Sequence, residues 1–305
     1  MSILNNLLAA FKPGKEFTLK EAYNANPDYP NESVRARIYE HLGTEFKKLS
    51  KGLYMTENVV LIEGDGRDLS IIDDSSIDCI ITDHPWEDKK SNNGGSRHLA
   101  QYDCFKYTQQ DFIEKARVLK EGSFLVEFIP AENANNFDYL YEIKKMAQLA
   151  GFQYYSKVAW KKGTFVSNTG RKAKNTEDIL IFSKGAPRKL RPDKQRGVIN
   201  GIPTRFMSGA NGMLPTEFNV QAVPNKKKTV QTEKPVPLFE QLLEYFTLPG
   251  ELVLDQFAGS GVTGEACRNK NRNCILVEKC KEHVEAIIRR LGLKDTLTAF
   301  HVETV

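Results

Sequence analysis

The chain has 305 residues, of which 40% are hydrophobic and 27% charged, with a formal net charge of +4. This composition is typical of a globular protein with one large or two smaller domains, and it excludes intrinsic disorder. No apolar run approaches the roughly 20 residues that span a bilayer, and the five cysteines lack zinc-type or CxxC spacing. We therefore expect no membrane partner, no metal site and a cytoplasmic protein with reduced thiols.

Residues 1–57 form the first unit in chain order. Asn31 or Ser33 can cap a helix with Val34 and Ile38 on its inner face. A short helix precedes it, and "KKLSKGLYMT" after it has the pattern of a β-hairpin. The unit resembles a winged helix-turn-helix, in which the second helix enters the DNA major groove. Arg35 and Arg37 are then candidate DNA contacts; a helical subdomain without a DNA role is the alternative.

Strands and helices alternate from residue 58 to about residue 185. The stretches "VVLIEGD", "IDCIITD", "SFLVEFI", "FQYYSKVAW" and "DILIFSK" have the pattern of buried strands. "TQQDFIEKARVL" and "FDYLYEIKKMAQLA" are amphipathic helices, the second ended by Gly151. This alternation predicts a doubly wound, mainly parallel α/β sheet, with its ligand site at the carboxyl ends of the strands. Asp65 and Asp83 both fall at that edge.

A basic segment follows. Between residues 186 and 234, ten basic residues stand against three acidic ones, a net charge of +7 that leaves −3 for the rest of the chain. A basic segment on a slightly acidic body indicates a polyanionic partner. A solvated surface is the alternative.

The last part of the sequence has the pattern of a cofactor site. A helix at 236–246 leads into the strand "LVLD", then a glycine loop, a helix and the strand "CILVE". Residues 259–264 fit GxGxxG, and Glu278 lies 19 residues beyond Gly259. Such a loop lets the backbone approach an adenosine-containing cofactor, NAD included. Asp255 at the strand end, however, offers a carboxylate to a cationic ligand.

Two signatures together resemble the S-adenosylmethionine-dependent DNA amino-methyltransferases. The family has an (Asp/Asn/Ser)-Pro-Pro-aromatic tetrapeptide, here Asp83-His84-Pro85-Trp86, and an Asp-x-Phe-x-Gly-x-Gly loop, here residues 255–261. The order of tetrapeptide, basic segment and cofactor loop is that of the β-type permutation. The resemblance covers most of 59–291. It implies a Rossmann-like methyltransferase domain at 58–305, with an inserted target-recognition region at about 186–231.

The resemblance also implies the site residues. The catalytic residues are Asp83, His84 (through its main-chain carbonyl), Pro85 and Trp86. The residues that bind S-adenosylmethionine are Asp65, Lys234, Asp255, Phe257, Ala258, Gly259, Ser260, Gly261 and Glu278. The candidate DNA contacts are Arg35, Arg37, Arg188, Arg191, Arg196, Arg205, Lys226, Lys227 and Lys228.

The residue types suit the chemistry. The lone pair of an exocyclic base amine is delocalised into the ring, so a carboxylate and a carbonyl that accept its two N–H bonds free that pair for the methyl group. Proline removes a competing donor, and an aromatic ring stacks on a base flipped out of the duplex. His84, where the family has proline, is expected to be a tolerated substitution with no role for its imidazole. Gln256, where proline is usual, is expected to be harmless.

These observations favour a sequence-specific adenine-N6 methyltransferase acting on duplex DNA. Asp rather than Ser at position 83 favours adenine over cytosine-N4. Two alternatives stay open: a methyltransferase for cytosine-N4, RNA or another amine, and a DNA-binding regulator without activity. The sequence also leaves a homodimer open.

Overall fold

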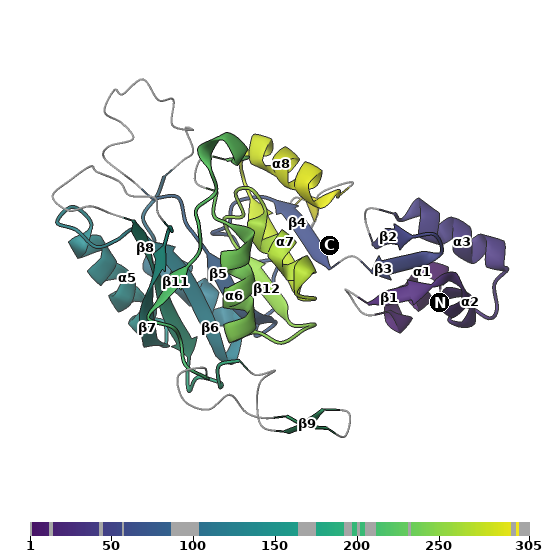
Figure 1. Ribbon diagram of the computed structural model, residues 1–305, viewed down its shortest axis with the longest axis horizontal. Helices are drawn as coiled ribbons and strands as arrows, with labels where there is room; N and C mark the ends of the chain where they lie inside the picture. The colour runs from purple at the N-terminus through teal and green to yellow at the C-terminus, as the bar shows by residue number, and fades with distance from the viewer. Residues whose placement is uncertain are drawn as a thin grey trace.

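One nine-stranded sheet organises the described part of the chain beyond residue 58, with strand order β11-β7-β8-β6-β5-β12-β13-β4-β14 (Figure 1). The computed structural model describes residues 2–11, 15–42, 45–56, 58–86, 104–163, 175–191, 197–199, 202–204, 212–230, 233–293 and 297–298. The strands are β4 (Val59–Glu63), β5 (Ile77–Thr82), β6 (Leu119–Ile129), β7 (Phe152–Lys161), β8 (Thr176–Lys184), β11 (Glu217–Asn219), β12 (Leu252–Asp255), β13 (Asn273–Glu278) and β14 (Leu297–Thr298). Only β8 runs antiparallel to its neighbours, so the predicted mainly parallel sheet is confirmed.

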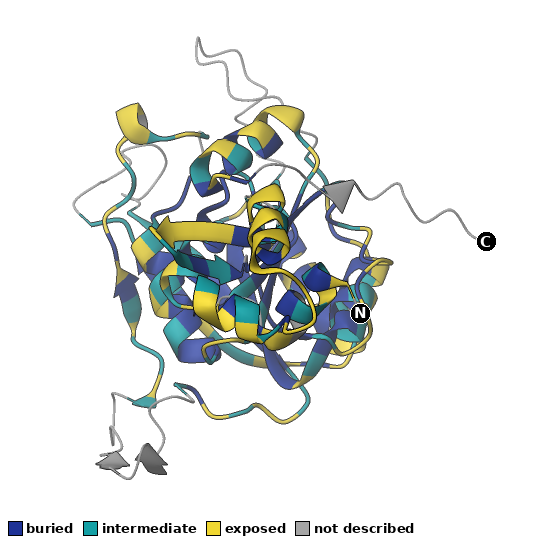
Figure 2. Ribbon diagram, turned by 90° about the vertical axis from the view of Figure 1, so that its right-hand side faces the viewer, coloured by how far each residue is buried: buried dark blue, intermediate teal, exposed yellow. Residues whose placement is uncertain are grey.

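Helices cover both faces of this sheet. They are α4 (Gln109–Val118), α5 (Phe137–Leu149), α6 (Val236–Phe246), α7 (Val262–Asn269) and α8 (Lys281–Leu291). Cys79 and Ile81 of β5 share a core cluster with α6, α7 and α8. Ile80, which points the other way, packs with α4 and α5. All six residues of β5 are buried, and apart from Asp78 and Thr82 they are apolar. Buried residues gather in the sheet and on the inner faces of the helices (Figure 2).

The connections diverge between β5 and β12. These strands are parallel neighbours, with Val253 opposite Cys79. From β5 the chain continues to β6 on one side, and from β12 it continues to β13 on the other. A ligand site is expected at the carboxyl ends of the strands at such a switch point. Asp83 and Asp255 lie at those two ends.

The N-terminal unit has its own sheet and core. Its elements are α1 (Ile3–Ala10), β1 (Glu16–Thr18), α2 (Leu19–Asn24), α3 (Asn31–Glu40), β2 (Phe46–Ser50) and β3 (Leu53–Thr56). The strands pair antiparallel in the order β1-β3-β2, and the core cluster includes Phe17, Val34, Ile38 and Phe46. Pro30 is the N-cap of α3. The prediction of Asn31 or Ser33 as cap is therefore wrong, since the fixed φ of proline suits the helix start.

The predicted short helix and hairpin of this unit are present, and its interpretation as a winged helix that binds DNA stays a prediction. The hairpin β9 (Gly197–Ile199) and β10 (Ile202–Thr204) and the 3-10 turn η3 (Asn225–Lys227) belong to the basic segment. Among the described helices, none is long and apolar enough to cross a membrane.

Candidate active site

Asp83 follows the last residue of β5 and is held by a buried cation. Its Oδ2 accepts a hydrogen bond from Nζ of Lys234, just before α6. The same ammonium lies 3.7 Å from Glu177 Oε2, and Glu177 in turn accepts a bond from Lys162. Burial raises the pKa of Asp83, and the charge of Lys234 opposes that shift. Burial alone would lower the pKa of Lys234, but Asp83 and Glu177 outweigh it and raise it. Lys234 therefore stays charged beside the carboxylate.

The glycine loop between β12 and α7 forms a second arm of the site. Gly259 and Gly261 have φ of 54° and 75°, the left-handed region that favours glycine. A Cβ on Gly261 would lie 3.1 Å from Ile287, so the loop passes too close to α8 for a side chain there. Asp255 is buried at its base and accepts hydrogen bonds from the Thr263 hydroxyl and the Phe257 N–H. Burial raises the pKa of Asp255 to about 7.

Glu278 and Asp65 lie at the carboxyl ends of neighbouring strands. Glu278 ends β13 and accepts from the main-chain N–H of Gly259 at 2.7 Å and of Cys280 at 2.9 Å. Asp65 follows β4 and lines a cavity of about 120 Å³. The cavity is lined by Ile62, Gly64, Asp65, Asp68, Ile71, Ile72 and Val277. An apolar slot with a carboxylate at its edge suits a flat heterocycle that carries an amine.

Aromatic rings connect the tetrapeptide to the glycine loop. The Phe105 ring lies 5.4 Å from the ring of Phe257, and the Phe105 N–H is 3.4 Å from the carbonyl of Pro85. Trp86 lies 4.1 Å from the imidazole of His84, measured between ring centroids. The sequence reasoning missed Phe105, which no motif marks. The two predicted signatures thus meet through a shared aromatic cluster.

Comparison with known proteins assigns the family. Residues 77–289 match the sequence model of the DNA methylase family N6_N4_Mtase. The chain belongs to this family. It is 28% identical over 230 residues to the Type II methyltransferase M.HpaI of Haemophilus parainfluenzae, across 73% of this chain and 70% of that protein. It is 26% identical over 252 residues to the orphan methyltransferase M.BamHII of Bacillus amyloliquefaciens, across 72% and 90% of the two chains.

Solved structures share the fold. The M1.HpyAVI–SAM complex matches 77% of this chain and 100% of its own, with a TM-score of 0.56 and 21% identity. The PvuII DNA methyltransferase, described as cytosine-N4-specific, matches 80% of this chain and 95% of its own, with a TM-score of 0.53 and 16% identity. The predicted family and the methyltransferase fold are confirmed. At these identities the structures establish the fold alone.

The two residues that depart from the methylase pattern, His84 and Gln256, both have hydrogen-bond partners in the fold. The side chain of His84 is fully buried, with both ring nitrogens within hydrogen-bond distance of a partner. The imidazole therefore has two polar contacts in the fold, and the expectation that it has no role in the reaction stays a prediction. Gln256 is also buried, and its Nε2 donates to the carbonyl of Gly66 at 2.7 Å. That bond ties the turn after β4 to the cofactor loop of the methyltransferase.

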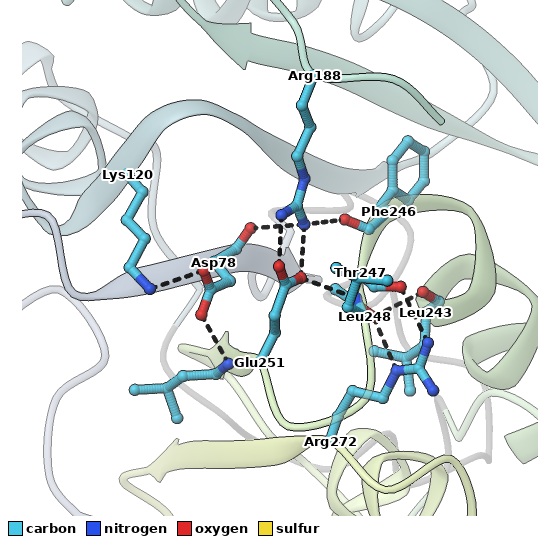
Figure 3. Close-up of polar contacts among 10 residues, drawn as sticks. Asp78, Lys120, Arg188, Leu243, Phe246, Thr247, Leu248, Glu251 and Arg272 are labelled. Carbon is cyan, nitrogen blue, oxygen red and sulfur yellow. Dashed lines mark hydrogen bonds and ion pairs between the residues drawn. The ribbon is translucent and has the colours of Figure 1, made fainter. Parts of the chain in front are cut away.

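Arg188 was predicted to contact DNA, and its contacts argue against that (Figure 3). Its guanidinium donates to both carboxylate oxygens of Glu251, at 2.7 and 2.8 Å, and to the carbonyl of Phe246. It also lies beside the carbonyl of Asp78, at the start of β5. Asp83 is five residues further along, about 16 Å away at the usual rise of a strand. Arg188 therefore stabilises the opposite edge of the methyltransferase sheet.

Arg191 lies at that edge too. Its guanidinium carbon is 4.2 Å from the ring centroid of Tyr245, and its main-chain N–H donates to the Tyr245 carbonyl. A guanidinium stacked on an aromatic ring is held by the protein itself. Neither Arg188 nor Arg191 faces the candidate active site of the methyltransferase. The sequence shows that a residue is basic but not where its side chain points, and this is why both were predicted to contact DNA.

The other basic candidates differ in position. Lys226 and Lys227 are exposed on η3. On α3, Arg35 lies over the ring of Tyr39 and Arg37 pairs with Glu40 at 2.8 Å. Arg196 and Arg205 lie outside the described residues.

Lys228 is half-buried, and its positive charge acts on Glu177, the second carboxylate beside Lys234. Burial would raise the pKa of Glu177, but the charges of Lys234 and Lys162 and, less strongly, of Lys228 lower it. Lys228 is therefore close to Glu177 and Lys234, which contact Asp83.

Proposed function

We propose that this protein transfers a methyl group to the exocyclic N6 amine of an adenine in a specific sequence of duplex DNA. The observation that carries the proposal is the position of Asp83. It is an acid at the carboxyl end of β5, beside the glycine loop that follows the neighbouring strand β12. Family membership supports the broader assignment to the DNA amino-methyltransferases.

The cofactor of this family is S-adenosylmethionine, which supplies an electrophilic methyl group on a sulfonium. The residues present fit it. Gly259 and Gly261 leave room for close backbone approach, and the buried carboxylate of Asp255 suits the cationic methionine portion. Glu278 at the end of β13 is placed for the ribose hydroxyls, and the cavity beside Asp65 for the adenine. These roles of single residues are part of the proposal.

Asp83 then acts on the base amine. Its Oδ2 is bonded to Lys234, which leaves Oδ1 for an amine N–H. The carbonyl of His84 accepts the second N–H, and Pro85 has no N–H to compete. The lone pair so freed attacks in line, the S–CH₃ bond breaks as the N–CH₃ bond forms, and the nitrogen releases a proton that Asp83 is placed to accept.

Trp86 supplies an aromatic surface beside this point. Its ring is packed against His84 on one side and is only partly buried. A flipped-out base stacks on such a ring, and each stacked base contributes about 1–3 kcal/mol in single-stranded complexes. An enzyme that acts on a base amine inside a duplex needs such a pocket.

Cytosine-N4 is the second candidate, because the family model that the chain matches, N6_N4_Mtase, is named for both amines. The test is methylation of unmodified genomic DNA with radiolabelled S-adenosylmethionine, followed by digestion and mass spectrometry of the nucleosides. Label in N6-methyladenine supports the proposal, and label in N4-methylcytosine refutes the base assignment. Label in RNA but not in DNA refutes the duplex DNA substrate.

DNA reading is proposed to reside in the basic segment. Lys228 lies near the Asp83 cluster, and Lys226 and Lys227 are exposed, so these three side chains are proposed to contact phosphates. Arg205 is the leading candidate for a base contact, at a cost of about 1–3 kcal/mol of discrimination if it is lost. The rival reader is α3, with Arg35 and Arg37. Deletion of residues 1–55 decides between them: loss of site preference with continued methylation would place specificity in the N-terminal unit.

A further inference from the structure

His84 belongs to a buried polar network that no family signature requires. Its Nδ1 lies 3.0 Å from Oε1 of Glu127 on β6, and its Nε2 lies 3.1 Å from the hydroxyl of Tyr139 on α5. The side chains of His84 and Glu127 have no exposed surface. A polar group buried to this degree is costly unless it is bonded, so the contacts of this histidine matter for the shape of the site.

Glu127 is an ionised hydrogen-bond acceptor. Lys115, also without exposed side-chain surface, donates to its Oε2 at 2.7 Å, and the Tyr107 hydroxyl donates to its Oε1 at 2.8 Å. Burial would raise the pKa of Glu127, but Lys115 and His84 outweigh it and lower it. Because a carboxylate can only accept, Nδ1 of His84 carries a proton and donates.

Tyr139 determines the state of the other ring nitrogen. Its hydroxyl accepts from the main-chain N–H of Tyr107 at 2.7 Å, so its own proton is available to Nε2 of His84. Nε2 is then an acceptor and the imidazole is neutral. Burial also lowers the pKa of His84, which agrees with that state. Both ring nitrogens of His84 thus have a matched partner, and a buried hydrogen-bonded network of this kind is rigid.

The network reaches the reacting surface through the tetrapeptide backbone. His84 is bonded through its side chain to β6 and α5, and its main-chain carbonyl is a proposed acceptor of the base amine. The imidazole also packs against Trp86 at 4.1 Å, and Trp86 lies 5.3 Å from the Tyr139 ring. A shift of the imidazole would thus move both the carbonyl and the aromatic surface.

We propose that His84 is a positioning residue, which, through Glu127 and Tyr139, fixes the turn after β5 for methyl transfer. The proposal rests on the proposed function. In the family pattern a proline stiffens this turn by its own ring; here the same rigidity is supplied by an imidazole anchored in the core. His84 is therefore the link between the charged pair Lys115–Glu127 and the base pocket.

The first test is Tyr139→Phe, which removes one hydroxyl and keeps the ring that packs on Trp86. The expected result is a single-turnover rate about ten- to a hundredfold lower, the fold-change that corresponds to losing one or two buried hydrogen bonds. Cofactor affinity should stay within about twofold, because Asp255 and Glu278 are untouched. The control is Tyr155→Phe, a partly buried phenol outside the network that packs on Phe124, with an unchanged rate. An unchanged rate in Tyr139→Phe overturns the proposal.

The second test is a series at His84 itself. The amide of His84→Asn can still donate to Glu127, so this variant should keep more single-turnover activity than His84→Ala or His84→Pro at equal cofactor occupancy. If His84→Pro is as fast as the wild type, the turn needs only a stiff residue and the positioning role is refuted. If His84→Asn is no faster than His84→Ala, the bond to Glu127 is not the relevant contact and the proposal also fails.

A third measurement does not depend on activity. Hydrogen exchange of the amides of Asp83, His84 and Trp86 should be faster in Tyr139→Phe than in the wild type, and unchanged in Tyr155→Phe. Equal exchange in Tyr139→Phe and the wild type contradicts the proposal. Wild-type protein that methylates no DNA would overturn the proposed function, while this exchange still tests the positioning role. Active wild type with unaffected network variants would overturn only the role of His84.

Discussion

We predict that Asp255 makes the affinity for S-adenosylmethionine depend on pH near neutrality. Burial raises the pKa of this carboxyl to about 7. If the cationic cofactor binds only the ionised form, the apparent dissociation constant is the intrinsic constant divided by the ionised fraction. That fraction is about one tenth at pH 6 and about nine tenths at pH 8, so binding should be about tenfold weaker at pH 6.

Calorimetric titration between pH 6 and pH 8.5 measures this directly. Asp255→Asn should bind the cofactor more weakly than the wild type at pH 8, and its affinity should no longer depend on pH through this side chain. Any pH dependence that comes from titration of the cofactor itself remains in both proteins. His283 lies 3.6 Å from Glu278, whose hydrogen bond raises the pKa of that imidazole, so its titration must be separated from that of Asp255. His283→Gln is therefore the matched control, and its cofactor affinity should keep the pH dependence that Asp255 causes.

The reasoning about Asp255 is refuted by either of two results. One is a wild-type affinity that changes by less than about twofold between pH 6 and pH 8. The other is an Asp255→Asn variant with the same pH dependence as the wild type. The folding stability of the cofactor-free protein should depend on pH in the opposite direction to the cofactor affinity. A raised carboxyl pKa favours folding at low pH, and this contribution is lost as the pH rises through about 7. Asp255→Asn should therefore unfold at higher temperature than the wild type at pH 8.

Four further predictions follow from the contacts. Asp83→Ala should abolish methyl transfer and leave cofactor affinity nearly unchanged, as measured by single turnover and calorimetry; more than a few per cent of residual rate contradicts its role. Lys234→Met should move the acidic limb of the pH–rate profile to higher pH, because Asp83 loses the charge that opposes its raised pKa, and Lys234→Arg should move it less; identical profiles would refute this. Replacing residues 226–228 by Ala should weaken binding to all DNA sequences alike and reduce the slope of log K against log salt by up to about 3; an unchanged slope places these lysines away from phosphates. Arg188→Ala should lower the free energy of unfolding by about 3 kcal/mol by leaving Glu251 unpaired, with no change in that salt slope; a changed slope would return Arg188 to the DNA interface.

The sequence alone determined the sheet and the two strand ends, those of β5 and β12, at which the candidate active site lies. β5 is buried on both faces and largely apolar, and α6 begins and ends where its amphipathic pattern predicts. Parallel strands bring their carboxyl ends to one edge. An acid after β5 and an acid at the end of β12 therefore had to lie at the same edge of the sheet. These are local patterns and a general rule of sheet geometry, which one sequence is enough to reveal.

Only the tertiary structure decided which charged side chains are partners. Glu127 stands alone in the apolar stretch "SFLVEFI", and Lys115 lies on the buried face of α4 beside Phe112. Both positions are signals of a buried charge, but nothing local says that Glu127 is the common partner of Lys115 and His84. Arg188 and Lys226 look alike in a basic segment, and one is bonded inside the fold while the other is exposed. The energy of a charge depends on its burial and on what lies within a few ångströms. Those distances join residues far apart in the chain, and they exist only once the chain is folded.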